Sequence, residues 1–310
     1  MSQDIMKDIS YPSLYIVLHD AIKKIIYQAG IVGVILTIAV YPYYNSFVTL
    51  LHSYNISERV IFTIIMFIAH TGTFISVAGY YLYCDYYKYN QQYKMNRKPS
   101  QMPSQQLIIR TFAEMMLNHF VTSPAIAYFM FGVFTSKFGM KSIYDTIPSY
   151  DILFRDYIRA HIFNDIGFYF THRLLHHPIF YTKFHKQHHE YKGTISIAAE
   201  YANPVESLLS NVIPSLGGVL FFQGHPLVIV IWLALRLRET YEAHSGYCFQ
   251  GSIMDKLGLM NSNNAIHHDH HHTANQGNYG SLYLDYVFGT MDLFVSGGGY
   301  EGYLKKKVKD

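Results

Sequence analysis

Cysteine and charge are both scarce in this sequence of 310 residues. Its two cysteines, Cys84 and Cys248, are too few for a disulfide framework or for a metal site of several thiolates. Charged residues make up 15% of the chain and hydrophobic residues 50%, a balance that is unusual for a soluble protein. The net charge is only +3, and the basic residues stand near apolar segments. This composition predicts an integral membrane protein with no nucleic-acid partner, in which any metal is bound through nitrogen and oxygen.

Long uncharged segments indicate membrane-spanning helices, which need about 20 residues to cross a bilayer. Residues 25–44 and 61–84 contain no Asp, Glu, Lys or Arg, and their tyrosines are typical of the membrane interface. Residues 208–235 are also uncharged, but "QGHP" at 223–226 interrupts them with turn chemistry, which predicts a hairpin of two helices. Residues 107–134 include two charged residues and a proline, so we expect this segment to lie partly in the interface.

Basic residues next to the spans predict the orientation of the chain. Lys23 and Lys24 precede the first span, and several lysines and an arginine follow the second, which places both ends in the cytosol. We therefore expect an all-α fold, an integral membrane helical bundle of about four spans with a histidine-rich helical cap on the cytosolic side. Residues 1–106 would form N-terminal membrane-anchoring helices, and residues 107–310 would carry the functional histidines.

Histidine is abundant, with 18 residues, of which 14 lie between His161 and His272. Nine stand at spacings that place imidazoles on shared helix faces, as a pair four residues apart, two sets at i, i+3 and i+4, and one after the hairpin. They are His172, His176, His185, His188, His189, His244, His268, His271 and His272. Nine exceeds the ligand number of one zinc or one octahedral ion, so we expect two metal ions. Imidazole suits zinc, copper, iron and nickel alike, so the spacing does not identify the metal.

Other residues near these motifs have weaker signals. His177, His267 and His270 point away from the expected ligand faces, and we expect them to support the site or lie at the surface. Asp165 and Asp269 could accept an N–H from a ligand imidazole, or they could be ordinary solvated or capping residues. The alternative for "HHDHHH" as a whole is a solvated loop that merely collects metal.

The motifs "HRLLHH", "HKQHH" and "HHDHHH", between about Phe163 and Asp292, resemble the three histidine boxes of the fatty acid hydroxylase and sterol desaturase superfamily. The stretches "AEYANPVES", "RLRETYEAHSGY" and "GNYGSLYLDYVFGTMD" resemble the C-4 methylsterol monooxygenases in particular. This resemblance implies that the nine histidines bind two iron ions, with zinc as an alternative in isolated protein. It also implies dioxygen as co-substrate and hydroxylation or desaturation of a sterol or sterol-like lipid.

The resemblance further implies an external redox partner and a particular membrane. Electrons would come from a b-type cytochrome or its reductase, because the chain has no flavin or haem motif of its own. The family is expected in the endoplasmic reticulum, with a mitochondrial membrane as the alternative. The tail "KKKVKD" at 305–310 is an imperfect match to a dilysine retrieval signal.

Three departures from the family pattern bear on the substrate. Asn203 in "YANP" stands where methylsterol enzymes commonly have His, and "CFQGS" follows "SGY" where they tend to have a proline. Both weaken the sterol assignment, whereas Thr240 replaces a histidine of the fatty-acyl branch and favours it. The alternatives are an acyl-lipid or sphingolipid hydroxylase, or an accessory subunit of a larger membrane complex that retains the fold. In that complex the polar N-terminus and the lysine-rich tail would contact a neighbour.

An oxygenase also needs a route for its lipid substrate. We expect the helices around "EYANPVESLL" and "LVIVIWLALRLRET" to line an apolar cavity that opens to lipid and ends at the histidines. An accessory subunit would not need such a cavity, so its presence helps to separate the two classes of function.

Overall fold

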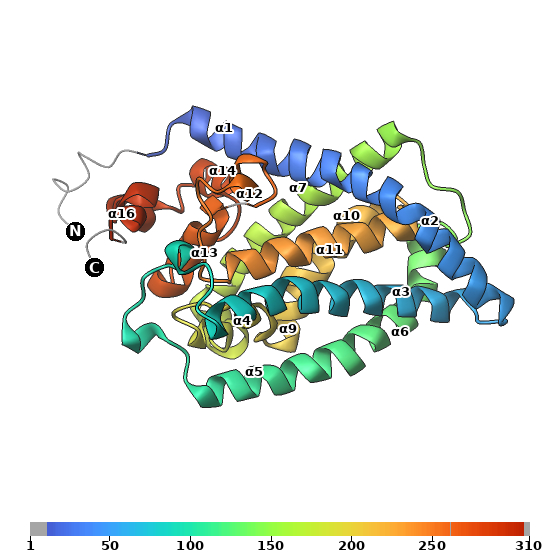
Figure 1. Ribbon diagram of the computed structural model, residues 1–310, viewed down its shortest axis with the longest axis horizontal. Helices are drawn as coiled ribbons and strands as arrows, with labels where there is room; N and C mark the ends of the chain where they lie inside the picture. The colour runs from blue at the N-terminus through green and yellow to red at the C-terminus, as the bar shows by residue number, and fades with distance from the viewer. Residues whose placement is uncertain (1–10, 261, 307–310) are drawn as a thin grey trace.

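The computed structural model describes residues 11–260 and 262–306 of the chain. About three quarters of the protein is helical, and the described residues form no β-strand. Long helices run side by side along the longest axis, and short helices gather at one end of them (Figure 1). The predicted all-α architecture is therefore confirmed. The contacts expected of the N-terminus and of the lysine-rich tail fall outside the described residues.

Four helical segments are long and apolar enough to cross a membrane, as the sequence predicted. The first two, Leu14–Ser53 and Glu58–Tyr86, each combine α-helical and π-helical parts. Their elements are α1 (Leu14–Ile22), η2 (Lys23–Ile31), α2 (Val32–Ser53), α3 (Glu58–Thr73), η3 (Phe74–Ala78) and α4 (Gly79–Tyr86). The first span is longer than the uncharged run 25–44, because charged side chains in its first half are buried inside the protein.

The third span, Pro99–Phe138, is the segment that we expected to lie partly in the interface. Its charged residues do not interrupt the helix, and its length and hydropathy are those of a spanning segment. The fourth span is Pro204–Phe221. The elements of both are η5 (Pro99–Gln101), α5 (Gln105–Leu117), η6 (Asn118–Thr122), α6 (Ser123–Phe138), α9 (Pro204–Glu206), η10 (Ser207–Val212) and α10 (Ile213–Phe221).

A sharp turn separates the fourth span from α11 (Pro226–Ala243), which confirms the predicted hairpin. Pro226 is the first residue of α11, a position where the missing N–H of proline costs nothing. The Nδ1 atom of His225 accepts the N–H of Leu227 at 3.1 Å and caps the new helix. The break is therefore a consequence of local sequence.

The centre of the bundle is formed by α11 and by α7 (Tyr150–Leu175), which pack among the spans. Trp232 of α11 is 1% exposed, and its Nε1–H donates to the carbonyl of Ser215 at 2.6 Å. Gly218 of α10 lies so close to α7 that a Cβ added there would stand 2.9 Å from the Cα of Ala160. Small residues allow this close approach of the two helices.

Another close approach, between η2–α2 and α7, gives a test of the packing. A Cβ on Gly33 would lie 2.7 Å from the Cγ of Tyr157, whose hydroxyl also bonds to Thr37 one turn later. We expect Gly33→Ala to lower the free energy of unfolding, because overpacking costs about 1–3 kcal/mol and outweighs the roughly 0.5–1 kcal/mol gained in helix propensity. Thermal denaturation in detergent measures the change.

The matched control is Gly72→Ala in α3, where an added Cβ meets no atom within 4 Å. This variant should keep or slightly raise the melting temperature. A Gly33→Ala protein as stable as the Gly72→Ala protein would contradict the packing of α2 on α7.

The cap consists of short helices at the ends of α7 and α11, so the predicted histidine-rich helical cap is present (Figure 1). A second hydrophobic cluster, which includes Ile266, Leu282 and Phe294, holds its C-terminal part together. The remaining elements are η4 (Gln91–Tyr93), α8 (Pro178–Phe180), η7 (Tyr181–His185), η8 (His188–Glu190), η9 (Ser196–Glu200), α12 (Ile253–Lys256), α13 (Ser262–Ala274), α14 (Leu282–Val287), α15 (Asp292–Ser296) and α16 (Gly299–Lys306).

Candidate metal centre

All nine predicted histidines come together where the cap meets α7 and α11. They form two groups, and within each group one ring nitrogen of every member lies within 4.8 Å of those of the others. The first histidine group is His172, His176, His185, His189 and His271, and the second is His188, His244, His268 and His272. The groups adjoin, since the ring centroids of His189 and His272 are 4.7 Å apart. We call the two groups together the histidine centre.

The end of α7 explains why His176 belongs to the centre and His177 does not. His172 lies in the last turn of α7, and His176 is the C-cap residue that follows Leu175. His177 precedes Pro178, which disfavours helical geometry, and it has the extended angles φ −64° and ψ 136°. Its side chain turns away and accepts the N–H of Ile179 at 3.4 Å. The exclusion of His177 from the ligand set agrees with this geometry.

The second box does not form the single helical stripe that its spacing suggested. His185 ends the π-helix η7, and His188 begins the 3₁₀-helix η8. This change of helix type turns neighbouring side chains to different sides, so His185 and His189 belong to the first group and His188 to the second. In α13, likewise, His271 faces the first group while His268 and His272 face the second. Each of these boxes therefore contributes to both groups.

The two other histidines of the third box lie outside the groups, as expected. His267 is buried with its Nε2 atom 3.8 Å from a carboxylate oxygen of Asp285. The ring of His270 packs against Phe294, with centroids 5.2 Å apart. Both side chains therefore hold α13 in the cap.

Backbone carbonyls fix the orientation of five rings in the centre. The Nδ1 atom of His172 lies 2.6 Å from the carbonyl oxygen of Tyr279, and that of His271 lies 2.6 Å from Gly277. The remaining pairs are His188 with Tyr201 at 3.2 Å, His244 with Thr240 at 2.8 Å, and His272 with Tyr191 at 2.9 Å. A carbonyl oxygen can only accept, so each Nδ1 carries the proton. In a neutral imidazole the Nε2 atom then has a free lone pair.

The rings are also held in the neutral form. Burial lowers the pKa of His188 to about 4, and burial together with the neighbouring imidazoles lowers that of His244 to about 3. Burial lowers the pKa of His172 to about 3 as well. At neutral pH these imidazoles are therefore uncharged and available as metal ligands.

The free lone pairs point at one another, and this arrangement is the strongest sign of a cation. The Nε2 atoms of His188 and His244 are 3.3 Å apart, although neither carries a proton. Closely spaced nitrogens also connect the first group, with Nε2–Nε2 distances of 3.1 Å from His172 to His185 and 2.9 Å from His185 to His176. Lone pairs buried against each other repel, and a metal ion among them removes this repulsion. The residues therefore fit the ions that the sequence led us to expect.

The carboxylates near the centre differ from the expected ones. Asp165 accepts the hydroxyl of Ser281 and lies 3.4 Å from the Nε2 of His161, so its expected pairing with a ligand imidazole is wrong. The carboxylate that does reach a ligand is Glu206 of α9, with Oε1 2.9 Å from the Nδ1 of His185. Its Oε2 is buried without a hydrogen-bond partner. Sequence reasoning missed Glu206, although the quoted stretch "AEYANPVES" contains it.

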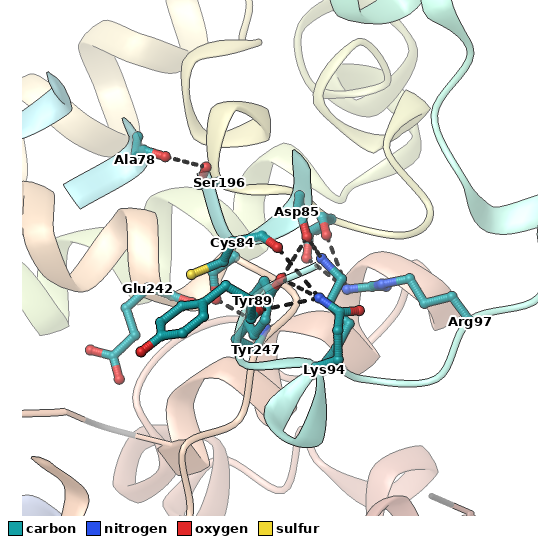
Figure 2. A network of polar contacts seen from close by, with 12 residues as sticks. Ala78, Cys84, Asp85, Tyr89, Lys94, Arg97, Ser196, Glu242 and Tyr247 are labelled. Atoms are coloured by element: carbon teal, nitrogen blue, oxygen red, sulfur yellow. Dashed lines mark hydrogen bonds and ion pairs between the residues drawn. The ribbon is translucent and has the colours of Figure 1, made fainter. Parts of the chain in front are cut away.

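Asp269 pairs with an arginine from the segment that follows α4. Arg97 forms a buried ion pair with Asp269 at 2.6 Å and donates to the carbonyl of Thr194. Close to Arg97, Lys94 and the hydroxyl of Tyr247 both reach Asp85 (Figure 2). The segment after α4 is thus fastened to α13 and to the loop that follows His244. Asp269 therefore helps to position the helix of the third box.

A cavity of about 60 Å³ adjoins the centre. Its wall includes one ligand candidate of the first group, His172, and three of the second. The segments that contain Ala202 and Ala243 contribute to it, so its location agrees with the prediction. Its chemistry does not, because several lining residues are polar or charged. They are Asp165, Glu206, Asn211, Arg236, Glu239, Thr240, Asn264 and Ser281.

Comparison with known families agrees with this geometry. The model of the fatty acid hydroxylase family matches residues 157–290, a range that contains all nine histidines of the centre. No solved structure gives a significant match to the chain.

Relatives with related activities extend over most of the sequence. A Dictyostelium discoideum protein, whose name assigns it provisionally to the methylsterol monooxygenases, is 31% identical over 274 residues, which are 86% of this chain and 94% of the relative. Methylsterol monooxygenase 1 of Gallus gallus is 30% identical over 228 residues, 71% of this chain and 75% of its own length. A fatty acid hydroxylase of Mycosarcoma maydis is 35% identical over 157 residues, 50% of this chain and 38% of its own.

Proposed function

Because the chain belongs to the fatty acid hydroxylase family, we propose that it is a membrane di-iron oxygenase that acts on a sterol or sterol-like lipid. The observation that carries the proposal is the pair of adjoining histidine groups, with five and four inward nitrogens. Imidazole-only sites suit iron, and two ions beside one cavity match the needs of oxygen chemistry. Bound iron would supply the activation of dioxygen for attack on a C–H bond.

The balance of the reaction requires a partner. One dioxygen molecule, two electrons and two protons convert a C–H group into C–OH and water. We propose that a b-type cytochrome or its reductase delivers the electrons, because no electron-carrying motif is present in the chain. The endoplasmic reticulum is the membrane in which we expect this pair to meet.

The chain's own residues would orient the substrate beside the centre. The cavity of about 60 Å³ has room for only a few water molecules, so it admits only the reacting end of a lipid. Asn211 belongs to η10 in the fourth span, which places one wall of the cavity at a membrane helix. Arg236 and Glu239, whose side chains lie 3.4 Å apart, offer a donor and an acceptor to a polar group next to the oxidised carbon.

The polar wall also bears on the alternatives. A plain methylene chain would displace water from these polar groups and offer them no hydrogen bond in return, which is costly, so the polar wall favours a sterol with a polar group over an acyl chain. An accessory subunit would need neither the cavity nor its contact with both histidine groups. Both alternatives remain as outcomes of the experiment below.

The test uses the full chain in lipid nanodiscs, loaded with ferrous iron and supplied with dioxygen and a reducing system. We expect at least two irons per chain, measured by elemental analysis, and oxidation of a 4-methylsterol detected by mass spectrometry. The same protein loaded with zinc is the control and should be inactive, because zinc has no redox chemistry. Oxidation of acyl lipids alone would support the acyl-lipid hydroxylase, and no oxidation of any sterol or acyl lipid by iron-loaded protein would refute the oxygenase assignment.

A further inference from the structure

A third polar cluster lies among the helices, apart from the histidine centre. His70 of α3, His119 of η6 and Glu200 at the end of η9 each place one donor atom within 4.8 Å of the others. Two of them belong to candidate membrane spans, where ionisable residues are rare and usually functional. The side chains of His119 and Glu200 are 2% and 6% exposed. His70 and His119 lie outside the histidine-rich region between His161 and His272, and the proposed oxygenase function does not use them.

One nitrogen in this cluster lacks the partner that a buried imidazole needs. The Nδ1 of His119 is engaged by the hydroxyl of Thr71 at 3.0 Å. Its Nε2 is buried without a hydrogen-bond partner and stands 3.7 Å from Oε1 of Glu200. This distance is too long for a hydrogen bond. A buried imidazole nitrogen and a carboxylate oxygen thus face each other across a gap.

Glu200 is held as an anion by its surroundings. Its oxygens accept from two neutral donors, the hydroxyl of Tyr241 and the amide of Asn118, the latter at 3.0 Å. Burial acts to raise the pKa of Glu200, but His119, His70 and Tyr241 outweigh it and lower this pKa to about 2. A buried carboxylate is costly unless a positive charge lies nearby. The imidazoles of this cluster can bind a cation together with Glu200.

We propose that His70, His119 and Glu200 form a third metal site, separate from the histidine centre, that binds a zinc-like divalent ion. Two imidazoles and one carboxylate are a donor set that zinc uses in proteins. The ion would satisfy the free Nε2 of His119 and neutralise Glu200 at once. The same set would also accept other first-row ions, so zinc serves as the probe.

The rings show what movement binding requires. His70 and His119 stack with centroids 4.1 Å apart and an angle of 14° between the rings, so their lone pairs lie in nearly parallel, separate planes. Rings in the histidine centre meet at steeper angles, for example 82° between His172 and His185. One ring of the stack must therefore rotate to bring both nitrogens to one ion. The hydrogen bond with Thr71 fixes the ring of His119, so we expect His70 to be the ring that turns.

The position of the site suggests a structural role next to the histidine centre. Glu200 is followed by Tyr201, whose carbonyl fixes the ring of His188. Tyr241, bonded to Glu200, stands one turn before His244 on α11. An ion at this site would therefore tie two membrane spans to the backbone that orients two ligand candidates.

Zinc binding to the full chain tests the proposal without reference to activity. The protein in nanodiscs is stripped of metal and titrated with zinc against a chromophoric chelator. We expect the wild-type protein to bind one equivalent more than Glu200→Gln and one more than His119→Gln. His52→Gln is the matched control, because His52 also lies in a spanning helix and bonds to a tyrosine, Tyr144, at 3.0 Å. It should bind as many equivalents as the wild type.

A direct measurement on the wild-type protein guards against variants that fail to fold. Anomalous scattering at the zinc edge from crystals of zinc-loaded protein should place an ion among the three side chains. No anomalous peak there, or equal zinc stoichiometry in the wild type and Glu200→Gln, would overturn the proposal. If the oxygenase assignment alone were refuted, the number of zinc equivalents bound would not change. The proposed function and the proposed third metal site can therefore fail separately.

Discussion

Replacing His188 with alanine should lower turnover by at least about 10³-fold, because the second histidine group then keeps only three imidazoles. His188 is the best single position for this test. Its Nε2 lies 3.3 Å from that of His244, its Nδ1 is fixed by the carbonyl of Tyr201, and it lines the cavity. We expect one metal equivalent to be lost as well. Sterol turnover and metal content per chain measure the two effects, and insertion into the membrane should be unchanged.

The matched control is His177→Ala, in the same histidine-rich region. His177 follows a ligand candidate directly, but its side chain is exposed and only caps α8. Loss of a cap costs about 1 kcal/mol of stability and should leave turnover and metal content near the wild-type values. Equal losses of activity in the two variants would show that the ligand assignment by helix face is wrong.

The membership of the histidine centre could be predicted from the sequence, but its division could not. Spacings of three and four residues bring imidazoles to one side of a helix, and this rule selected eight of the nine residues that the structure brings together. The ninth, His244, stands alone in its segment, and its selection rests on the resemblance to the family. His188 and His189 are adjacent in the chain and belong to different groups, because a π-helical turn and a 3₁₀ turn meet there. Such local changes of helix type depend on tertiary packing, and the residue pattern does not reveal them.

The extent of the first span shows a similar limit. Lys24, four residues after Asp20, set the start of the predicted span, because a charge count treats every charged residue as exposed. In the structure the two side chains are buried and lie 3.7 Å apart, one helical turn from each other. Pairing removes most of the cost of burial, so the helix begins earlier than the uncharged run. The partners of Asp165 and Asp269 could not be chosen for a related reason, since helical phase does not show that His161 lies near Asp165 or that Arg97 lies near Asp269.

The sequence pattern also did not predict that the cavity is polar. Arg236 and Glu239 follow a long apolar run, and a membrane helix would be expected to turn them to water. In the structure they pair with each other and line the cavity beside the histidines. A cavity wall is built from several elements, so its chemistry appears only when α7, α11 and α13 are placed together.

The second large effect is expected at Glu206, the carboxylate that the sequence analysis missed. Its Oε1 lies 2.9 Å from the Nδ1 of His185, on the side of the ring opposite to the nitrogen that faces the first group. A carboxylate in this place orients the ring and makes the nitrogen that faces the first group a stronger metal ligand. We expect Glu206→Ala to weaken metal binding by about 10–100-fold, the usual effect of losing such a partner. Metal affinity, measured by competition with a chelator, reports this effect directly.

Two further variants separate this support from general damage to the cap. Glu206→Gln keeps an oxygen that can accept from His185 but replaces the carboxyl group with an amide, so its affinity for metal should lie between those of the wild type and Glu206→Ala. Glu190→Ala is the control, because Glu190 also follows the second box but is exposed to solvent. It should bind metal like the wild type. If Glu206→Ala bound metal as tightly as Glu190→Ala, the contact between Glu206 and His185 would have no part in holding the ion. The buried carboxyl group would then need another explanation, such as a contact with the substrate in the cavity that it lines.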